Sequence, residues 1–157
     1  MGNNWKITDT LTKVFADEVP DGQGSIRLST LHRETVSCVI AYFGAADWGR
    51  YWKVSVKAPE KIETRLRRVE LVPSAYPCHK EQDDNYLRIV PGMYPDLLRD
   101  LDTEDDGADK KYLTKEVPGQ WRSLWLDVTV DAELASGDYA IVIETETEDG
   151  EKETLKA

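Results

Sequence analysis

Hydrophobic residues recur at every second position of this chain, and this alternation limits the possible folds more than any other feature. In Tyr51–Ala58 the apolar and polar side chains alternate without interruption. The same pattern occurs in Leu124–Val130, in Tyr139–Glu148 and, more briefly, in Ile26–Ser29. A period of two places alternate side chains on opposite faces of a β-strand, and the 3.6-residue period of an amphipathic helix does not recur. The chain is therefore predicted to be all-β.

Turn-forming residues separate these segments and suggest how the strands connect. Asp21–Gly24, Val117–Gly119 and Ser136–Asp138 combine glycine with polar residues or proline, and Asp149-Gly150 is a strong signal for a two-residue hairpin turn. Eight or nine short strands connected in this way predict an antiparallel β-sandwich of the jelly-roll or Greek-key kind. The length of 157 residues fits one sandwich domain that spans residues 1–157.

Three segments depart from simple alternation. Val36–Phe43 is apolar at both phases, which predicts a central strand covered on both faces. The phase of Arg65–Val72 changes midway, which predicts a β-bulge. Pro73–Glu116 shows no sustained pattern except at Tyr86–Val90, so it is predicted to be one long irregular connection. A connection of that length often carries function or packs against a neighbour.

Charge excludes some classes of partner. The formal net charge is −10, which opposes binding to the phosphates of nucleic acid and to anionic lipid surfaces. No apolar run reaches the roughly 20 residues of a membrane-spanning helix, and the first residues do not resemble a signal peptide. We therefore expect neither nucleic acid nor a membrane as partner. The expected location is cytoplasmic, or secreted if a leader precedes this sequence.

The sequence offers no recognisable catalytic or metal-binding constellation. Its adjacent acids (Asp17-Glu18, Asp83-Asp84, Glu104-Asp105 and Glu148-Asp149) lie in polar loops or turns, where nothing would raise a pKa for acid catalysis. His32 stands alone, and the pair Cys78-His79 lacks two further ligands for zinc. Cys38 is expected to be a buried free thiol, with a disulfide to Cys78 as the alternative. No catalytic residue, metal ligand or cofactor is predicted.

An acidic segment begins like a calcium-binding loop. Asp102, Glu104, Asp106 and Gly107 have the spacing of its first half, but Leu113 occupies the twelfth position, where a bidentate glutamate is required. A solvated surface loop is the main interpretation, with an irregular weak calcium site as the alternative.

The aromatic residues divide by strand phase. Phe43, Trp52 and Tyr139 share a phase with core positions and are predicted to pack inside the sandwich. Trp125 lies between Leu124 and Leu126 in sequence, so the pleat turns its side chain to the opposite face, and Trp121 has the same phase. These two tryptophans are therefore predicted to project outward.

An outward indole needs an explanation, because large exposed apolar patches are uncommon on solitary domains. We expect the apolar segment Pro91–Leu98, with Tyr94, to fold over Trp125, and Tyr94 and Trp125 to mark the side that packs against another domain. The alternative is carbohydrate binding through Trp48, which lies in a predicted turn, Trp121 and Trp125, since an indole can pack against the apolar face of a sugar.

Several segments, taken in order, resemble the N-terminal domain of proteins related to glycoside hydrolase family 123. These segments are Leu11–Phe15, Ile26–Thr35, Pro91–Leu98, Leu124–Val130 and Ala135–Tyr139. The resemblance extends from about Trp5 to Glu153, and one departure is Ser37-Cys38-Val39, where the family pattern has a glutamine.

The resemblance implies a jelly-roll-like β-sandwich that precedes a barrel catalytic domain. Enzymes of family 123 are β-N-acetylgalactosaminidases that use an adjacent Asp-Glu pair in the barrel, so no acid of this chain inherits a catalytic role. The expected function is a non-catalytic N-terminal domain that braces or shapes a downstream catalytic domain of the same polypeptide. The alternatives are a carbohydrate-binding module with glycans as partners and, last, an independent enzyme that uses the acidic loops.

Overall fold

The structure is a computed structural model that describes residues 4–45, 50–76, 86–105 and 110–157. The described residues contain ten β-strands and no helix. The strands are β1 (Trp5–Thr8), β2 (Thr35–Phe43), β3 (Tyr51–Lys57), β4 (Ile62–Ser74), β5 (Gly92–Asp100), β6 (Thr103–Asp105), β7 (Lys110–Lys115), β8 (Trp121–Val130), β9 (Val142–Thr147) and β10 (Lys152–Lys156). The all-β prediction is confirmed.

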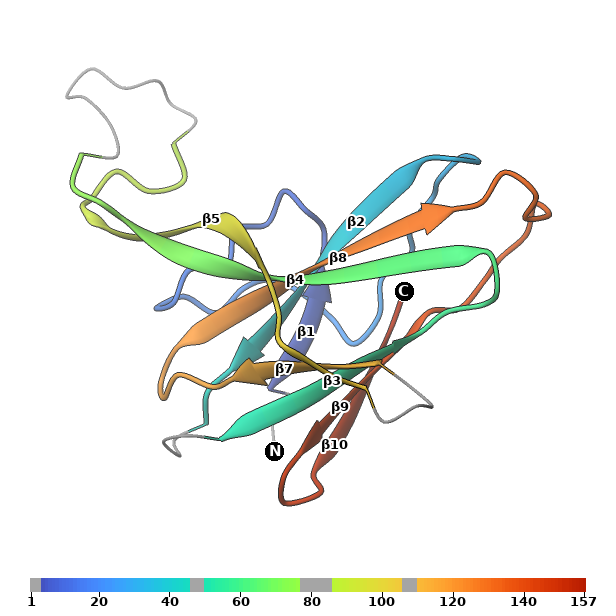
Figure 1. The fold of residues 1–157 in the computed structure, drawn as a ribbon. Coiled ribbons are helices and arrows are strands. Elements are labelled where there is room, and N and C mark those ends of the chain that lie inside the picture. The colour runs from blue at the N-terminus through green and yellow to red at the C-terminus, as the bar shows by residue number, and fades with distance from the viewer. Residues whose placement is uncertain (1–3, 46–49, 77–85, 106–109) are drawn as a thin grey trace.

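The strands form two five-stranded antiparallel sheets that pack face to face (Figure 1). The first sheet has the order β1-β2-β8-β4-β5, and the second has the order β10-β9-β3-β7-β6. The chain passes from one sheet to the other after β2, β3, β5, β7 and β8, so both sheets are built from segments spread along the whole chain. The predicted antiparallel sandwich is confirmed.

The main core lies between the sheets and is built around aromatic residues. Trp5 stacks on Tyr42 with ring centroids 4.8 Å apart, and Trp52 meets Trp5 edge-on at 5.2 Å. Leu124 and Leu126 of β8 are fully buried on the same face, as the alternation predicts. Burial of large rings is the main source of stability in a core of this kind.

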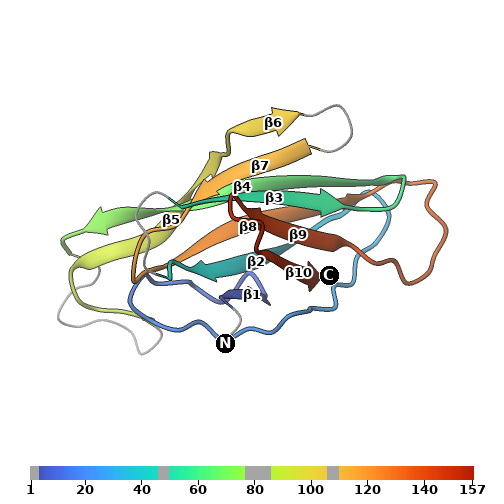
Figure 2. The ribbon, with the colours of Figure 1, turned by 90° about the horizontal axis from the view of Figure 1, so that it is seen from below.

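The first sheet is also buried in part on its outer face. Val39 and Ala41 of β2 form a second apolar cluster with Trp121 and Val14, and Phe43 and Trp125 pack against it. We call this the outer cluster. Val14 belongs to the connection between β1 and β2, which Figure 2 shows in blue along the outside of the molecule. The prediction that β2 is a central strand covered on both faces is confirmed.

Other local predictions are confirmed by the strand pairing and the side-chain burial. Asp149-Gly150 joins β9 to β10, and Gly150 has a φ of 81°, a backbone conformation that glycine adopts without strain. Cys38 is a buried free thiol, and burial raises its pKa to about 12 with a smaller contribution from the charge of Asp127. Cys78 lies outside the described residues.

Four predictions of local structure are wrong. Residues 26–29 form no strand, although Ile26 and Leu28 pack against the core. Tyr139 is exposed, because β9 begins only at Val142. Phe43 packs in the outer cluster and not between the two sheets. By contrast, the predicted β-bulge within 65–72 is confirmed, because a register shift lies between Glu70 and Leu71 in the pairing of β4 with β5.

The fourth wrong prediction is the long irregular connection over 73–116. This region contains β5, β6 and β7, whereas residues 86–90 form no strand. β5 is the edge strand of the first sheet, and β6 is the edge strand of the second.

Candidate functional site

The three tryptophans of the alternative sugar-binding prediction differ in where the structure places them. Trp121 is only 7% exposed and belongs to the outer cluster, so it is a packing residue. Trp125 projects from the outer face of the first sheet, as the strand phase predicts, and it is half-buried. Trp48 lies outside the described residues. Of these three, Trp125 is the described indole that remains partly accessible.

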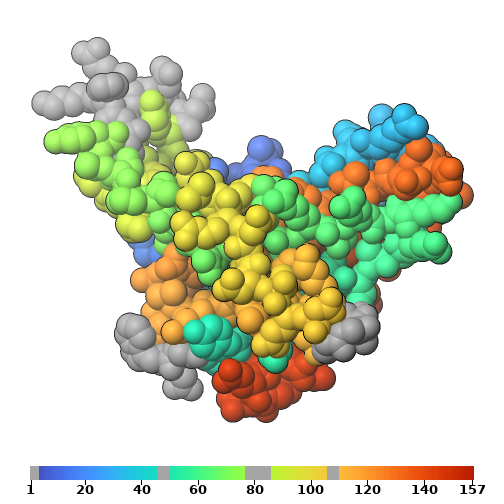
Figure 3. Space-filling view, in the orientation of Figure 1, coloured from blue at the N-terminus to red at the C-terminus, as the bar shows by residue number. Residues whose placement is uncertain are grey.

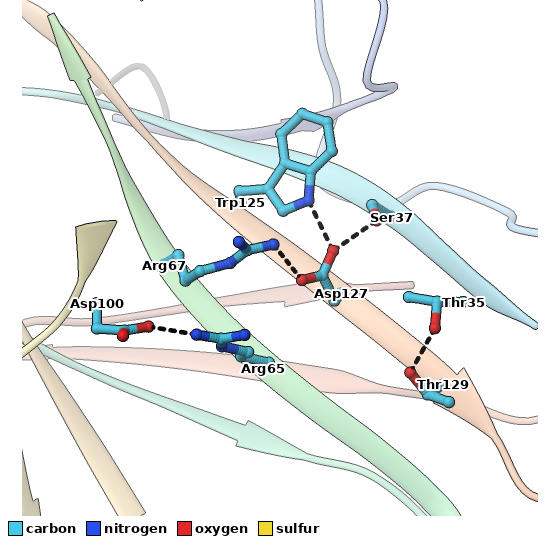
Figure 4. A network of polar contacts seen from close by, with 8 residues as sticks. All are labelled: Thr35, Ser37, Arg65, Arg67, Asp100, Trp125, Asp127 and Thr129. Atoms are coloured by element: carbon cyan, nitrogen blue, oxygen red, sulfur yellow. Dashed lines mark hydrogen bonds and ion pairs between the residues drawn. The ribbon is translucent and has the colours of Figure 1, made fainter. Parts of the chain in front are cut away.

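Trp125 is held in place by a hydrogen-bond network centred on Asp127 (Figure 4). The indole Nε1 donates to Asp127 Oδ1 at 2.7 Å, and the Ser37 hydroxyl donates to the same oxygen at 2.7 Å. The Arg67 guanidinium donates to Asp127 Oδ2 at 2.5 Å. These residues come from the neighbouring strands β2, β8 and β4, and the pairings of Ser37 with Asp127 and of Arg67 with Trp125 bring them together.

The network keeps Asp127 ionised. Burial alone would raise its pKa, but the hydrogen bonds from Ser37, Trp125 and Arg67 and the charge of Arg67 outweigh that effect, so the pKa lies below its usual value. A lowered carboxylate pKa stabilises the fold above the pKa of the unfolded chain, and this contribution is lost as the pH falls through the folded value. Asp127 is therefore a charged anchor at neutral pH and not a candidate general acid.

Two further polar pairs extend the network over the same face. The hydroxyls of Thr35 and Thr129 lie 2.7 Å apart, and Arg65 donates to Asp100 Oδ1 at 2.9 Å. Figure 4 shows Trp125 at one end of this arrangement and the threonine pair at the other. We call these eight residues the polar face: Thr35, Ser37, Arg65, Arg67, Asp100, Trp125, Asp127 and Thr129.

The sequence contains one indication of this face, which is the strand phase of Asp127. Asp127 has the same outward phase as Trp125, but its partners Ser37 and Arg67 are set by strand register. Register depends on contacts between distant parts of the chain, so sequence reasoning missed the network.

Tyr94 does not cover Trp125 in the predicted way. Residues 92–100 form β5 instead of a loop folded over the outer face, so that prediction is wrong. The ring of Tyr94 meets Phe15 edge-on at 5.7 Å, and its hydroxyl donates to the carbonyl of Val90 at 2.5 Å. The apolar contacts of Trp125 come from the outer cluster, which includes Val14 of the β1–β2 connection.

The ends of β4 and β5 extend beyond the rest of their sheet. β4 pairs with β8 only as far as Val69, whereas its pairing with β5 continues to Ser74 (Figure 1). We call residues 70–74 and 86–97 the β4–β5 arm. In Figure 3 β5, in yellow-green to yellow, lies uncovered on the near face.

The arm carries a concentration of exposed apolar side chains. They are Tyr86, Leu87, Ile89, Val90, Met93 and Leu97. Arg88 fixes the arm to the β1–β2 connection, because it lies 3.9 Å from the ring centroid of Phe15 and forms ion pairs with Asp17 and Glu18. Apolar side chains gathered on a fixed support are typical of a protein–protein contact surface.

A groove of about 710 Å³ lies at the end of the sandwich, between residues 26–32 and 134–141. Its lining includes the apolar side chains of Leu28, Val128 and Ile141 together with the polar Arg27 and His32. Arg27 is paired with Asp138 at 3.0 Å. A groove of this size could hold a small ligand, but no hydrogen bond among the described residues joins His32 to a serine or threonine of the lining, and Asp138 is the one Asp or Glu that lines it.

Three of the adjacent acids, Asp17, Glu18 and Glu104, serve as surface partners of cations. Asp17 and Glu18 bind Arg88, and Glu104 binds Lys53 at 2.7 Å. Asp83, Asp84, Cys78 and His79 lie outside the described residues. Within the described part of the chain, His, Cys, Asp and Glu form no group of three or more that could hold a metal ion. The same residues include no helix of the length and apolarity needed to cross a membrane.

We expect calcium to leave the melting temperature unchanged. Glu104 belongs to β6 and is paired with Lys53, and Leu113 lies in β7, which pairs antiparallel with β6, whereas Asp106 and Gly107 lie outside the described residues. Thermal unfolding with and without about 1 mM calcium measures this, because a ligand that binds only the folded state raises the melting temperature. A rise of several degrees that a chelator reverses would show that the segment binds calcium.

Comparison with known proteins gives a similarity of fold. No protein-family model matches the chain, and no curated protein matches it. A solved structure described as a family 123 glycoside hydrolase from Clostridium perfringens, studied for glycolipid glycan hydrolysis, is similar with a TM-score of 0.61 and 9% sequence identity. The similarity covers 97% of this chain and 26% of that chain, so this chain spans about a quarter of the other's length. At this identity the likeness shows a shared sandwich fold.

Proposed function

We propose that this chain is a non-catalytic β-sandwich domain of a glycoside hydrolase-like protein, in which it braces a barrel catalytic domain. The observation that carries the proposal is the structural similarity, which includes nearly all of this chain but only 26% of a glycoside hydrolase of family 123. In that enzyme the same fold accompanies a much longer polypeptide. The predicted resemblance to the N-terminal domain of such proteins supports the same assignment.

The β4–β5 arm is the surface that fits the bracing role best. It projects beyond β8 and presents Met93 and Leu97, which are both about half exposed, on a base that Arg88 holds through two ion pairs. A rigid base limits the entropy lost when such side chains are buried against another domain. Tyr94 contributes by binding the 86–90 segment to β5, which gives it a supporting role in the proposed interdomain contact.

The environment of the adjacent acids Asp17 and Glu18 supports the absence of catalysis in this proposal. In the common mechanism two carboxylates flank the scissile bond, and one of them must be protonated to act as the acid. Asp17 and Glu18 instead share the cation Arg88, which lowers the pKa of Asp17 through a hydrogen bond. An ionised Asp17 is unsuited to act as the acid in this reaction.

The first test is therefore hydrolysis. The purified chain should release no product from aryl N-acetylgalactosaminides or aryl N-acetylglucosaminides, whereas the product of the complete reading frame should do so if its barrel is active. Removal of residues 1–157 from that longer product should lower its solubility and its activity together. Turnover by the isolated chain that disappears when one of its own acids is mutated would contradict the proposal.

Thermal unfolding of the longer product tests the contact surface. In the longer product, the double substitution Met93→Glu and Leu97→Glu should separate one melting transition into two, because charges would then lie in an apolar contact. The isolated chain should tolerate both changes, since both positions are exposed. Thr103→Glu, at an exposed position of β6, is the matched control. A reading frame that ends at Ala157, or a barrel that is equally stable without residues 1–157, would contradict the bracing role.

A further inference from the structure

The polar face combines paired charges with hydroxyl groups in a way that the fold does not require. Arg65 and Asp100 lie at the surface, with side chains 59% and 74% exposed, and their isolated ion pair contributes little to stability. Thr35 is exposed on the same face, and its hydroxyl is paired with that of Thr129. A stable sheet would form with many other side chains at these positions.

The charge of this face differs from that of the whole chain. The chain has a formal net charge of −10, whereas on this face the cations Arg65 and Arg67 are paired with the anions Asp100 and Asp127, and Glu63 opposite Thr129 adds one further negative charge. The paired charges attract no ion at a distance, and the remaining negative charge disfavours an anionic ligand. The face does present strong donors and acceptors side by side, which suits an uncharged ligand with many hydroxyl groups.

The part of the face around Asp127 is also ordered before any ligand arrives. Asp127 accepts hydrogen bonds from Ser37, Arg67 and the indole of Trp125, so the rotamers of all three are fixed by one carboxylate. On its apolar side Trp125 packs against the outer cluster. Side chains that are already immobilised lose little entropy on binding, so the affinity for a polar ligand is higher than it would be for mobile side chains.

We infer that the polar face is a binding site for a neutral oligosaccharide. The apolar face of one sugar ring packs against the accessible part of Trp125, and the hydroxyls of the following units bond with Arg65, Asp100 and the threonine pair. The arrangement in Figure 4 sets the direction, because Trp125 and the threonine pair lie at opposite ends of the network. This site does not depend on the proposed bracing role, which involves the β4–β5 arm.

The test is a nuclear magnetic resonance titration of the isotope-labelled chain with tetrasaccharides. The neutral probes are β-linked tetramers of glucose, mannose, galactose and N-acetylglucosamine, and the anionic probe is a tetramer of galacturonic acid. At least one neutral tetramer should shift the amide signals of Thr35, Ser37, Asp127 and Thr129 at millimolar concentration. The galacturonic acid tetramer should bind more weakly.

A matched pair of arginine variants separates binding from folding. Arg65→Ala should weaken the affinity about tenfold with an unchanged melting temperature, because it removes charged hydrogen-bond donors from an exposed position. Arg27→Ala is the control, since Arg27 forms a similar exposed pair with Asp138, which is not part of the polar face, and should leave binding unchanged.

Three results would overturn the inference. One is the absence of any shift with all four neutral tetramers, and another is a shift confined to residues outside the polar face. The third is binding that Arg65→Ala leaves intact. None of these results bears on the bracing role, which is judged by the activity and the melting of the longer product.

Discussion

Replacing Trp52 by alanine should remove most of the stability of the domain. Trp52 is 1% exposed and meets Trp5 edge-on, so the change leaves a large cavity in the main core. Truncation of a buried tryptophan costs about 3–5 kcal/mol, a large part of the roughly 5–15 kcal/mol that stabilises a domain. Urea unfolding followed by circular dichroism measures the loss.

A second effect adds to the cavity at this position. The indole Nε1 of Trp52 donates to Glu116 Oε1 at 2.6 Å, and Glu116 is only 2% exposed. Without the indole that carboxylate loses its hydrogen-bond donor in a buried position, which costs about another 1–3 kcal/mol. Trp52→Ala is therefore expected to exceed the effect of a cavity alone.

A double-mutant cycle isolates the hydrogen bond from the packing. Trp52→Phe keeps a ring in the core but leaves Glu116 without its donor, and Glu116→Leu leaves the Trp52 indole without its acceptor. The double variant should be more stable than the sum of the two losses predicts, because neither buried group is then unpaired. Additive losses would show that the bond contributes nothing, and a loss below about 1 kcal/mol for Trp52→Ala would contradict the core position of this ring.

The sequence predicts the inner parts of this sandwich well, because the alternation of buried and exposed side chains can be recognised within a single strand. The alternation of β8 places Leu124 and Leu126 in the core, and the unbroken apolar pattern of β2 reflects real cover on both faces. Both predictions require only that a strand has two faces.

The same reasoning fails for strands whose buried face is not apolar. In β7 the inward residues are Tyr112 and Thr114. Thr114 is buried, and its hydroxyl forms a hydrogen bond of 2.7 Å with that of Tyr42. Because threonine is polar, its burial cannot be recognised from a hydrophobic pattern, and the sequence of β7 shows no alternation of apolar and polar residues. β5 is hidden for another reason, since its register shift and Pro95 interrupt the pattern, and both are tolerated because it is an edge strand.

The candidate site was only half predictable. The outward phase of Trp125 follows from the alternation, whereas its polar partners depend on which strands become neighbours. The sequence also does not show which segment packs over the outer face of the first sheet. This cover was expected from residues 91–98, but residues from the β1–β2 connection supply it, more than a hundred positions away from Trp121.

That cover gives the second large expected effect, which is the replacement of Trp121 by alanine. Trp121 is 7% exposed, its ring centroid lies 5.4 Å from that of Phe43, and its backbone NH donates to the carbonyl of Ala16 at 2.9 Å. The change should cost about 3–5 kcal/mol, as for other buried rings. Trp125→Ala is the comparison, and it should cost less, about 1–2 kcal/mol, because Trp125 is only half-buried.

The two variants should also differ in where the structure loosens. Val14 packs in the outer cluster with Trp121, so loss of that ring removes part of the surface on which the β1–β2 connection rests. Hydrogen exchange in residues 9–20 should accelerate in Trp121→Ala before the rest of the sandwich is affected, because a segment with few apolar contacts opens locally at low free-energy cost. In Trp125→Ala the same amides should remain protected. If both variants lost equal stability with equal exchange, the β1–β2 connection would not be the cover of the outer face.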